Sequence, residues 1–248
     1  SVTNSRGERE ICDAIISAAR TIGIPQNNDF NGKDQEGVGY FQLTARNGKR
    51  CSSAVGYLDP VKKRQNLKVV TKAQVTKLIF AENDSSSVLG VQFLYKKIES
   101  AAYLNVGGEV ILSSGTIGSP QLLQLSGIGP GAVLQRFGIN VQKNLPGVGQ
   151  NLQDHLQIRL VFEVNIPTLN DDINNFFRRA LMGMQYIMFR SGPMTAGASQ
   201  VCIFTKTNNN IDTPDIQFHF QPLSADKPGV KMHPFSGITL SVCQLHPE

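Results

Sequence analysis

The sequence predicts a mixed fold of the α+β and α/β classes. Three observations support this prediction. An amphipathic helical pattern opens the chain, several strand-like runs follow it, and one short apolar run leads through small residues into a helix. The composition agrees with a folded globular chain, because 40% of the 248 residues are hydrophobic and 17% are charged.

The charge distribution argues against nucleic-acid binding. The formal net charge is +5, but the basic residues are dispersed and the longest basic cluster is Lys62, Lys63 and Arg64. The four cysteines lie far apart, which favours a reducing, cytoplasmic location without zinc or disulfides. We find neither a signal peptide nor an apolar run long enough to span a bilayer. Peripheral association with the inner face of a membrane stays possible by composition.

The first part of the chain predicts one helix and a β-meander. Apolar residues at helical spacing over 11–18, ended by Gly23 and Pro25, predict an amphipathic helix. A polar, loop-like region follows, with a short helix expected at 52–58. Residues 67–80 and 88–95 then have the composition and partial alternation of strands.

The most informative stretch covers residues 107–131. The apolar run 110–112 predicts a strand buried on both faces, and small residues at 113–115 follow it. Ser119 and Pro120 are expected to supply the N-cap and first position of a short helix over 121–126. In this arrangement backbone N–H groups face a phosphate or dinucleotide, because no bulky side chain blocks its approach and the helix dipole favours an anion.

The remainder of the chain predicts further helices and strands. Helices are expected at 132–137 and 173–190, and strands at 157–164, 200–205, 215–220 and 237–244. Residues 180–189 are apolar nearly all round and are bracketed by Arg178, Arg179 and Arg190. We expect this helix to be buried. A membrane-docking or substrate-entry element is the alternative, since ten apolar residues cannot span a bilayer.

Common catalytic motifs are missing from the sequence. It contains no GxSxG elbow, no phosphate loop, no HExxH and no GxGxxG, and its four histidines are scattered. These observations disfavour hydrolase and kinase functions.

Five sequence blocks, in order, resemble one family. GTIGSPQLLQLSGIG at residues 115–129 is similar to the second signature of the glucose–methanol–choline oxidoreductases, flavoproteins that oxidise alcohols with FAD. LPGVGQNLQDH at 145–155 resembles a loop of the same family. Further similar blocks are NGKDQEGVG at 31–39, RCSSAVGYL at 50–58 and SGPMT at 191–195. The choline-dehydrogenase-like branch is the most similar.

The resemblance implies a domain plan and a cofactor site. Residues 66–155 would be the return half of a Rossmann-like FAD-binding domain, 1–65 a substrate or cap-region segment, and 156–248 an incomplete substrate-binding domain with an antiparallel sheet and helices. Val75 would contact the adenine through its backbone. The turn formed by Ser114, Gly115 and Thr116, with Ser119 beside it, would lie near the ADP part of FAD.

The resemblance also implies that this chain is an interior piece of a longer enzyme. The family's GxGxxG unit and its C-terminal catalytic His are both missing from the sequence, so no residue of this chain is assigned as catalytic. The implied reaction removes the hydroxyl proton of an alcohol and transfers a hydride to flavin N5. The electrons would pass to a membrane quinone or to oxygen. We expect the 248-residue piece alone to be inactive and to bind FAD weakly or not at all.

Two residues bear on the substrate. Gln200 stands where choline-oxidising relatives are expected to carry a Glu that balances the quaternary ammonium. A neutral amide cannot neutralise a buried cation, so an uncharged alcohol is favoured over choline. His219 lies on an expected strand and is a candidate for facing the substrate cavity, with a structural or surface role as the alternative.

Two other function classes are alternatives to this one. A non-catalytic binding or scaffold protein that kept the substrate-domain fold is the main alternative. A nicotinamide-dependent dehydrogenase is disfavoured, because no Rossmann fingerprint with an acidic ribose partner is present.

Overall fold

The computed structural model describes residues 1–5, 7–82, 84–227 and 229–246. The chain forms two compact units. Unit 1 comprises Ser1–Lys63 and Asp154–Glu248, and unit 2 comprises Arg64–Gln153. The mixed fold class is confirmed, since each unit combines helices with antiparallel strands. The first and last segments, expected to be separate, share one sheet in unit 1, because β2 (Gly37–Tyr40) pairs with β12 (Val201–Thr205).

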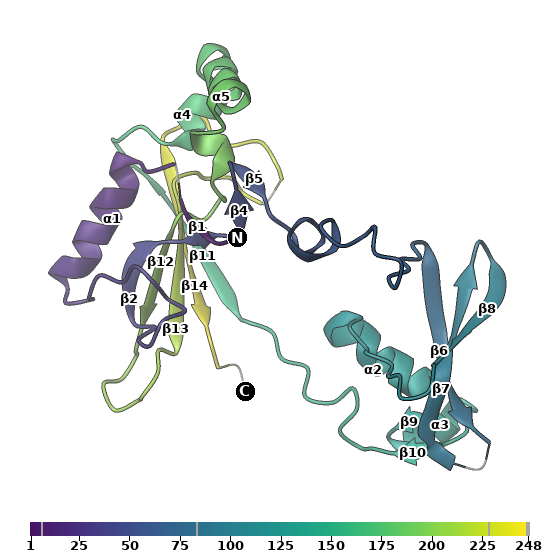
Figure 1. Ribbon diagram of the computed structural model, residues 1–248. Helices are drawn as coiled ribbons and strands as arrows, with labels where there is room; N and C mark the ends of the chain where they lie inside the picture. The colour runs from purple at the N-terminus through teal and green to yellow at the C-terminus, as the bar shows by residue number, and fades with distance from the viewer. Residues whose placement is uncertain (6, 83, 228, 247–248) are drawn as a thin grey trace. The chain divides into compact units, whose positions relative to one another are not determined.

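A five-stranded antiparallel sheet is the centre of unit 1 (Figure 1). Its strands lie in the order β11-β14-β13-β12-β2. They are β2 (Gly37–Tyr40), β11 (Gln157–Glu163), β12 (Val201–Thr205), β13 (Ile216–Gln221) and β14 (Gly237–Gln244). The four strands expected from the second half of the sequence are thereby confirmed, and β2 is an addition from the first half.

Helix α1 (Glu10–Thr21) covers one face of this sheet. Its apolar side buries Ile11, Cys12 and Ala19 against the sheet, as the helical spacing predicts. Alternation along β13 supplies part of the other half of the core, because Phe218 and Phe220 point towards α1.

The helix expected over 173–190 is in fact two helices. α4 (Leu169–Asn174) starts at Thr168, whose side chain forms a capping box with Asp171, and α5 spans Phe176–Phe189. The break falls at Asn175, which has an extended backbone and accepts a hydrogen bond from the N–H of Arg178. The Asn175 side chain thereby caps the start of α5, which ends one helix and begins the next. The spacing of apolar residues contains no sign of this break.

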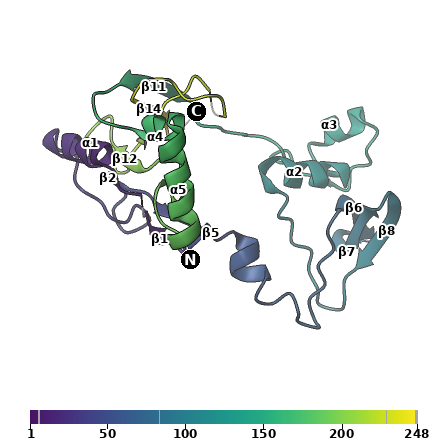
Figure 2. The ribbon, with the colours of Figure 1, turned by 90° about the horizontal axis from the view of Figure 1, so that it is seen from above.

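The expectation that residues 180–189 are buried is wrong. No residue of α5 is buried, and the main neighbours of α5 within its unit are α4 and the 3-10 turn η2 (Pro193–Thr195). Figure 2 shows α5 as a rod that follows α4. A nearly all-apolar helix is expected inside a core only where other elements surround it, and unit 1 supplies too few.

Unit 2 contains the expected meander, with one strand more than the sequence suggested. It is formed by β6 (Ala73–Ala81), β7 (Asp84–Tyr95) and β8 (Ile98–Tyr103). Lys96 and Lys97 join β7 to β8 in a two-residue turn, and both have positive φ angles. Such turns are usually marked by Asn or Gly, so two lysines gave no signal. Residues 67–72, expected to be extended, lie outside β6.

The predicted buried strand at 110–112 is also wrong. These residues form no strand, and Ile111 is 81% exposed. A strand buried on both faces needs neighbouring strands and covering helices, and none of the described strands pairs with this run.

Helix α2 (Gly115–Leu125) starts six residues earlier than expected. Ser119 is therefore not the N-cap, and Pro120 lies inside the helix. The Oγ of Ser119 instead accepts a hydrogen bond from the N–H of Ser114 at 3.0 Å. A proline removes only one intrahelical hydrogen bond, which a helix tolerates near its start.

The remaining elements are short. Helix α3 (Gly131–Arg136) confirms the second helix expected in this region, and β9 (Ile128–Gly129) pairs in parallel with β10 (Lys143–Asn144). A π-helical turn, η1 (Ala54–Leu58), lies within the short helix expected at 52–58. In unit 1, β1 (Thr3–Asn4) pairs with β3 (Gln42–Leu43), and β4 (Ala45–Arg46) pairs with β5 (Lys49–Arg50).

Candidate cofactor site

The start of α2 brings together four of the five residues expected to bind the cofactor. Ser114 is the N-cap residue, and Gly115, Thr116 and Ser119 lie in the first turns. Gly115 has φ +79°, and a Cβ added there would meet no atom within 4 Å. The backbone at this position is therefore left-handed and approachable, and the first N–H groups of a helix have no intrahelical partner.

Val75 and Ser114 line one cavity of about 340 Å³ in unit 2. Val75 lies on β6, and Leu122 of α2 forms part of the same wall. The buried Ser126 ties α2 to this strand, because its Oγ accepts the N–H of Leu78 at 2.9 Å and donates to the carbonyl of Leu122 at 2.6 Å. Two distant parts of the sequence are thereby fixed beside one cavity.

A second cavity, of about 510 Å³, joins α2 to the loop at residues 147–153. Thr116 lines it, and the Nε2 of Gln124 donates to the carbonyl of Val148 at 3.0 Å. Gly149 has φ +79°, and a Cβ there would lie 2.6 Å from that Nε2. In the sequence this loop is marked only by its likeness to a family block, and its glycines are the one local sign that it lies close to α2.

The geometry fits the dinucleotide that the resemblance implies. All side chains that line the second cavity are uncharged, so an anion there would meet no carboxylate, and Thr116 from the first turn of α2 is part of its lining. Glu109 is the charged residue of the first cavity, which suits a neutral ring better than a phosphate. Ser119 holds the intervening turn through Ser114.

The two residues expected to face the substrate lie on opposite faces of the sheet in unit 1. Val201 is the strand partner of Phe220, and the backbone N–H of Gln200 also donates to the carbonyl of Phe220. Two consecutive residues thus lie opposite one residue of β13, and the side chain of Gln200 points towards α1. It is 1% exposed and accepts a hydrogen bond from the Sγ of Cys12 at 3.4 Å. Its Nε2 has no acceptor within the described part of the chain.

His219 faces away from α1. Its Nδ1 lies 3.3 Å from the Nε2 of Gln157, and its ring stacks on Phe41 with the ring centroids 5.9 Å apart. Burial lowers the pKa of His219, and the nearby His155 lowers it further. The imidazole is therefore neutral at pH 7.

This neutral state gives a testable pH dependence. We expect the His219 ring to titrate below pH 6.5 in an NMR experiment, and His155→Gln to raise its midpoint. Because the folded state disfavours the charged ring, the stability that His219 contributes is present above its unfolded pKa and is lost as the pH falls. His219→Gln is expected to reduce the acid sensitivity of folding between pH 7 and 5. A midpoint at or above 6.5 contradicts the burial of this ring.

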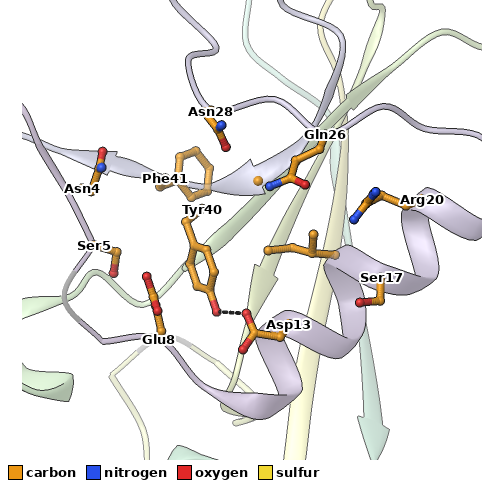
Figure 3. A pocket seen from close by; sticks show the side chains of 12 residues that line it. Asn4, Ser5, Glu8, Asp13, Ser17, Arg20, Gln26, Asn28, Tyr40 and Phe41 are labelled. Atoms are coloured by element: carbon orange, nitrogen blue, oxygen red, sulfur yellow. Dashed lines mark hydrogen bonds between the residues drawn. The ribbon is translucent and has the colours of Figure 1, made fainter.

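A polar pocket of about 600 Å³ lies between α1 and β2 in unit 1 (Figure 3). The hydroxyl of Tyr40 donates to the Oδ1 of Asp13 at 2.7 Å, and Glu8 and Arg20 also line the pocket. Burial and the hydrogen bond to Asp13 raise the pKa of Tyr40, so it stays a neutral donor. Sequence reasoning singled out none of these residues.

Among the described residues, the thiols and the metal-ligating side chains form no second reactive centre. Burial raises the pKa of Cys12 and that of Cys202 to about 12, so both thiols are protonated and unreactive at neutral pH. Across residues 1–5, 7–82, 84–227 and 229–246, no group of three or more metal-ligating side chains gathers. In that same part of the chain, no helix has the length and hydropathy needed to cross a membrane.

Comparison with known proteins identifies the family. Residues 1–157 match the family model described as GMC oxidoreductase. The chain therefore belongs to the GMC oxidoreductase family, which confirms the resemblance seen in the sequence.

The similar proteins are more than twice as long as this chain. It is 37% identical over 248 residues to "Alcohol dehydrogenase [acceptor]" of Pseudomonas putida, with 100% of this chain and 44% of that protein covered. It is 37% identical over 237 residues to "Oxygen-dependent choline dehydrogenase" of Vibrio vulnificus, with 95% and 41% covered. The chain thus spans less than half the length of these relatives.

Solved structures share the fold. Formate oxidase from Aspergillus oryzae has a TM-score of 0.83 at 23% identity, covering 100% of this chain and 47% of the other. An FAD-dependent oxidoreductase from Chaetomium thermophilum has a TM-score of 0.82 at 20% identity, covering 99% and 48%. These likenesses confirm the expected fold class.

Proposed function

We propose that the whole protein is an FAD-dependent oxidoreductase that acts on the CH–OH group of an alcohol. The observation that carries this proposal is the start of α2, where an open Gly115 stands between two cavities. Family membership and relatives named as alcohol and choline dehydrogenases support it.

In this proposal the residues of unit 2 hold the cofactor. The backbone at Val75 would contact the adenine, the turn at Ser114, Gly115 and Thr116 would receive the ADP phosphates, and Ser119 would keep that turn in place. Bound FAD would supply a hydride acceptor at flavin N5.

The substrate in this proposal is an uncharged alcohol. Gln200 is neutral and buried, so the carboxylate expected for balancing a quaternary ammonium is missing at this position. Because its side chain contacts Cys12 of α1, Gln200 would act through its lack of charge and not as a ligand. His219, which is neutral and hydrogen-bonded to Gln157, is the candidate for facing the substrate.

The proposal includes an acceptor and a location. Electrons would pass to a membrane quinone, with oxygen as the other candidate, and the protein would associate peripherally with the inner face of a membrane from the cytoplasm. The relative named "Alcohol dehydrogenase [acceptor]" supports a non-oxygen acceptor.

The experiment is a spectral titration of the whole protein. We expect flavin bands near about 380 and 450 nm, which are bleached without oxygen by uncharged primary alcohols and less efficiently by choline. In a separate turnover assay, a soluble dye would accept the electrons and reoxidise the flavin. A protein without flavin bands would instead favour a non-catalytic binding role, and faster bleaching by choline would refute the assignment of an uncharged substrate.

A further inference from the structure

Helix α5 presents an apolar face outward from unit 1. At about 100° per residue, the side chains at positions 176, 177, 180, 181, 184, 187 and 188 fall within one arc of about 140°. Phe177 is 77% exposed and Ile187 is 73% exposed. A contiguous apolar face of this kind is unusual on a protein surface, because isolated apolar side chains are the norm there.

Arginines flank this face on both sides. By the same helical rotation, Arg178 lies beyond one edge of the arc and Arg179 beyond the other. Arg190 is the C-cap residue that directly follows the helix. The guanidinium of Arg179 lies 6.0 Å from the ring centroid of Phe176, and that of Arg190 lies 4.8 Å from that of Tyr186. Long cationic side chains beside an apolar face are typical of helices that lie in a membrane interface.

The sequence from residue 173 to residue 211, which includes α5, carries basic residues but no acidic ones. The acidic residues on either side of this stretch are Asp172 and Asp212. Asp172 itself is shared, since its carboxylate forms ion pairs with Arg9 and, at 3.7 Å, with Arg178. Arg179 and Arg190 form no ion pair within the described residues.

We propose that α5 is a docking element for an anionic lipid surface. The helix would lie in the plane of the interface, with its apolar face among the acyl chains and its arginines at the phosphate groups. Its 14 residues span about 21 Å, which suits lying on a bilayer and not crossing it. This inference deepens the proposed function, because it places the dehydrogenase at the surface that contains the quinone.

A second copy of the chain fits this face less well. In a two-fold antiparallel pairing of α5, the Arg178 and Arg179 end of one helix would meet Arg190 of the other. Such a contact brings like charges together without a carboxylate on α5 to balance them. An anionic membrane satisfies both the apolar face and its arginine edges.

Vesicle co-sedimentation of the whole protein tests the proposal. We expect binding to vesicles of phosphatidylcholine with one quarter phosphatidylglycerol, weaker binding to phosphatidylcholine alone, and loss of binding in about 0.5 M salt. Ile187→Gln should weaken binding about tenfold. Replacing Arg178 and Arg179 with Gln should weaken it about fivefold for each arginine.

The matched control is Ile22→Gln. Ile22 is 77% exposed at the end of α1, and the same chemical change there should leave vesicle binding unaltered. Alcohol-dependent reduction of a soluble dye should be the same in all variants, so a loss of activity would concern the proposed function and not this inference.

Three outcomes overturn the proposal. The first is a lack of binding to anionic vesicles, or binding that Ile187→Gln does not change. The second is a fall in Tm for Ile187→Gln that Ile22→Gln does not show, which would mean that another protein segment covers α5. The third is dissociation of a dimer by Ile187→Gln, which would assign the face to a second copy.

Discussion

Gly115→Val is expected to lower the affinity of the whole protein for FAD at least tenfold. Gly115 has φ +79°, a region that costs an L-residue about 1–2 kcal/mol and a β-branched one more. The new side chain would also occupy the space in front of the first helix N–H groups, where the phosphates are proposed to bind. The flavin-to-protein ratio and a fluorescence titration of the apoprotein measure this effect.

Gly138→Val is the matched control for this experiment. Gly138 follows α3 in the same unit, has φ +68°, and likewise has no atom within 4 Å of an added Cβ. We expect a similar backbone strain with nearly unchanged FAD affinity. Equal losses in both variants would attribute the effect to strain within unit 2 and would remove Gly115 from the cofactor site.

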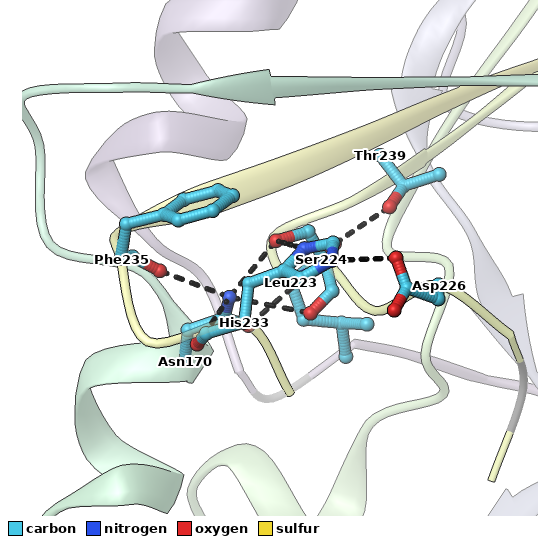
Figure 4. A network of polar contacts seen from close by, with 7 residues as sticks. All are labelled: Asn170, Leu223, Ser224, Asp226, His233, Phe235 and Thr239. Atoms are coloured by element: carbon cyan, nitrogen blue, oxygen red, sulfur yellow. Dashed lines mark hydrogen bonds and ion pairs between the residues drawn. The ribbon is translucent and has the colours of Figure 1, made fainter. Parts of the chain in front are cut away.

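Asn170→Ala is expected to destabilise unit 1 by about 3 kcal/mol. Asn170 is fully buried in α4 and joins three backbone segments (Figure 4). Its Nδ2 lies 2.9 Å from the Oγ of Ser224 and 3.0 Å from the carbonyl of Phe235, and its Oδ1 accepts the N–H of Ser224 at 2.9 Å. The truncation leaves these buried groups without partners, each at a cost of about 1–3 kcal/mol.

Urea unfolding of the whole protein measures the change, with two companion variants. Asn174→Ala removes an exposed amide that donates to the carbonyl of His233 at 2.8 Å, and it should cost less than about 1 kcal/mol. Asn170→Asp keeps the acceptor for Ser224 and loses the donor, so it should destabilise at least as much as Asn170→Ala at pH 7. A loss below about 1 kcal/mol for Asn170→Ala would show that water replaces the amide.

Parts of the fold were predictable because their signals are local. The apolar spacing in α1 and the alternation in β13 specify which face is buried whatever lies opposite. The capping box that starts α4 is an equally local signal, since Thr168 and Asp171 have the required spacing. The helix was nevertheless predicted to start at residue 173, because the prediction followed the apolar pattern.

The candidate site was partly predictable. The small residues at 113–115 and the family blocks singled out the start of α2, but the role of Ser119 was misjudged, because a Ser before a Pro is the usual sign of a helix start. Only the folded chain shows that its Oγ accepts the N–H of Ser114 and that Gln124 and Gly149 close the neighbouring cavity.

The sequence by itself determined the family, the main helices and most strands, and the neutral residue at position 200. The tertiary structure decided what depends on distant partners. It pairs β2 with β12, leaves the apolar run 110–112 without a strand partner, turns Gln200 towards Cys12, and exposes α5. The physical reason is that periodicity records which side of an element is apolar, whereas burial and pairing depend on which other elements reach it.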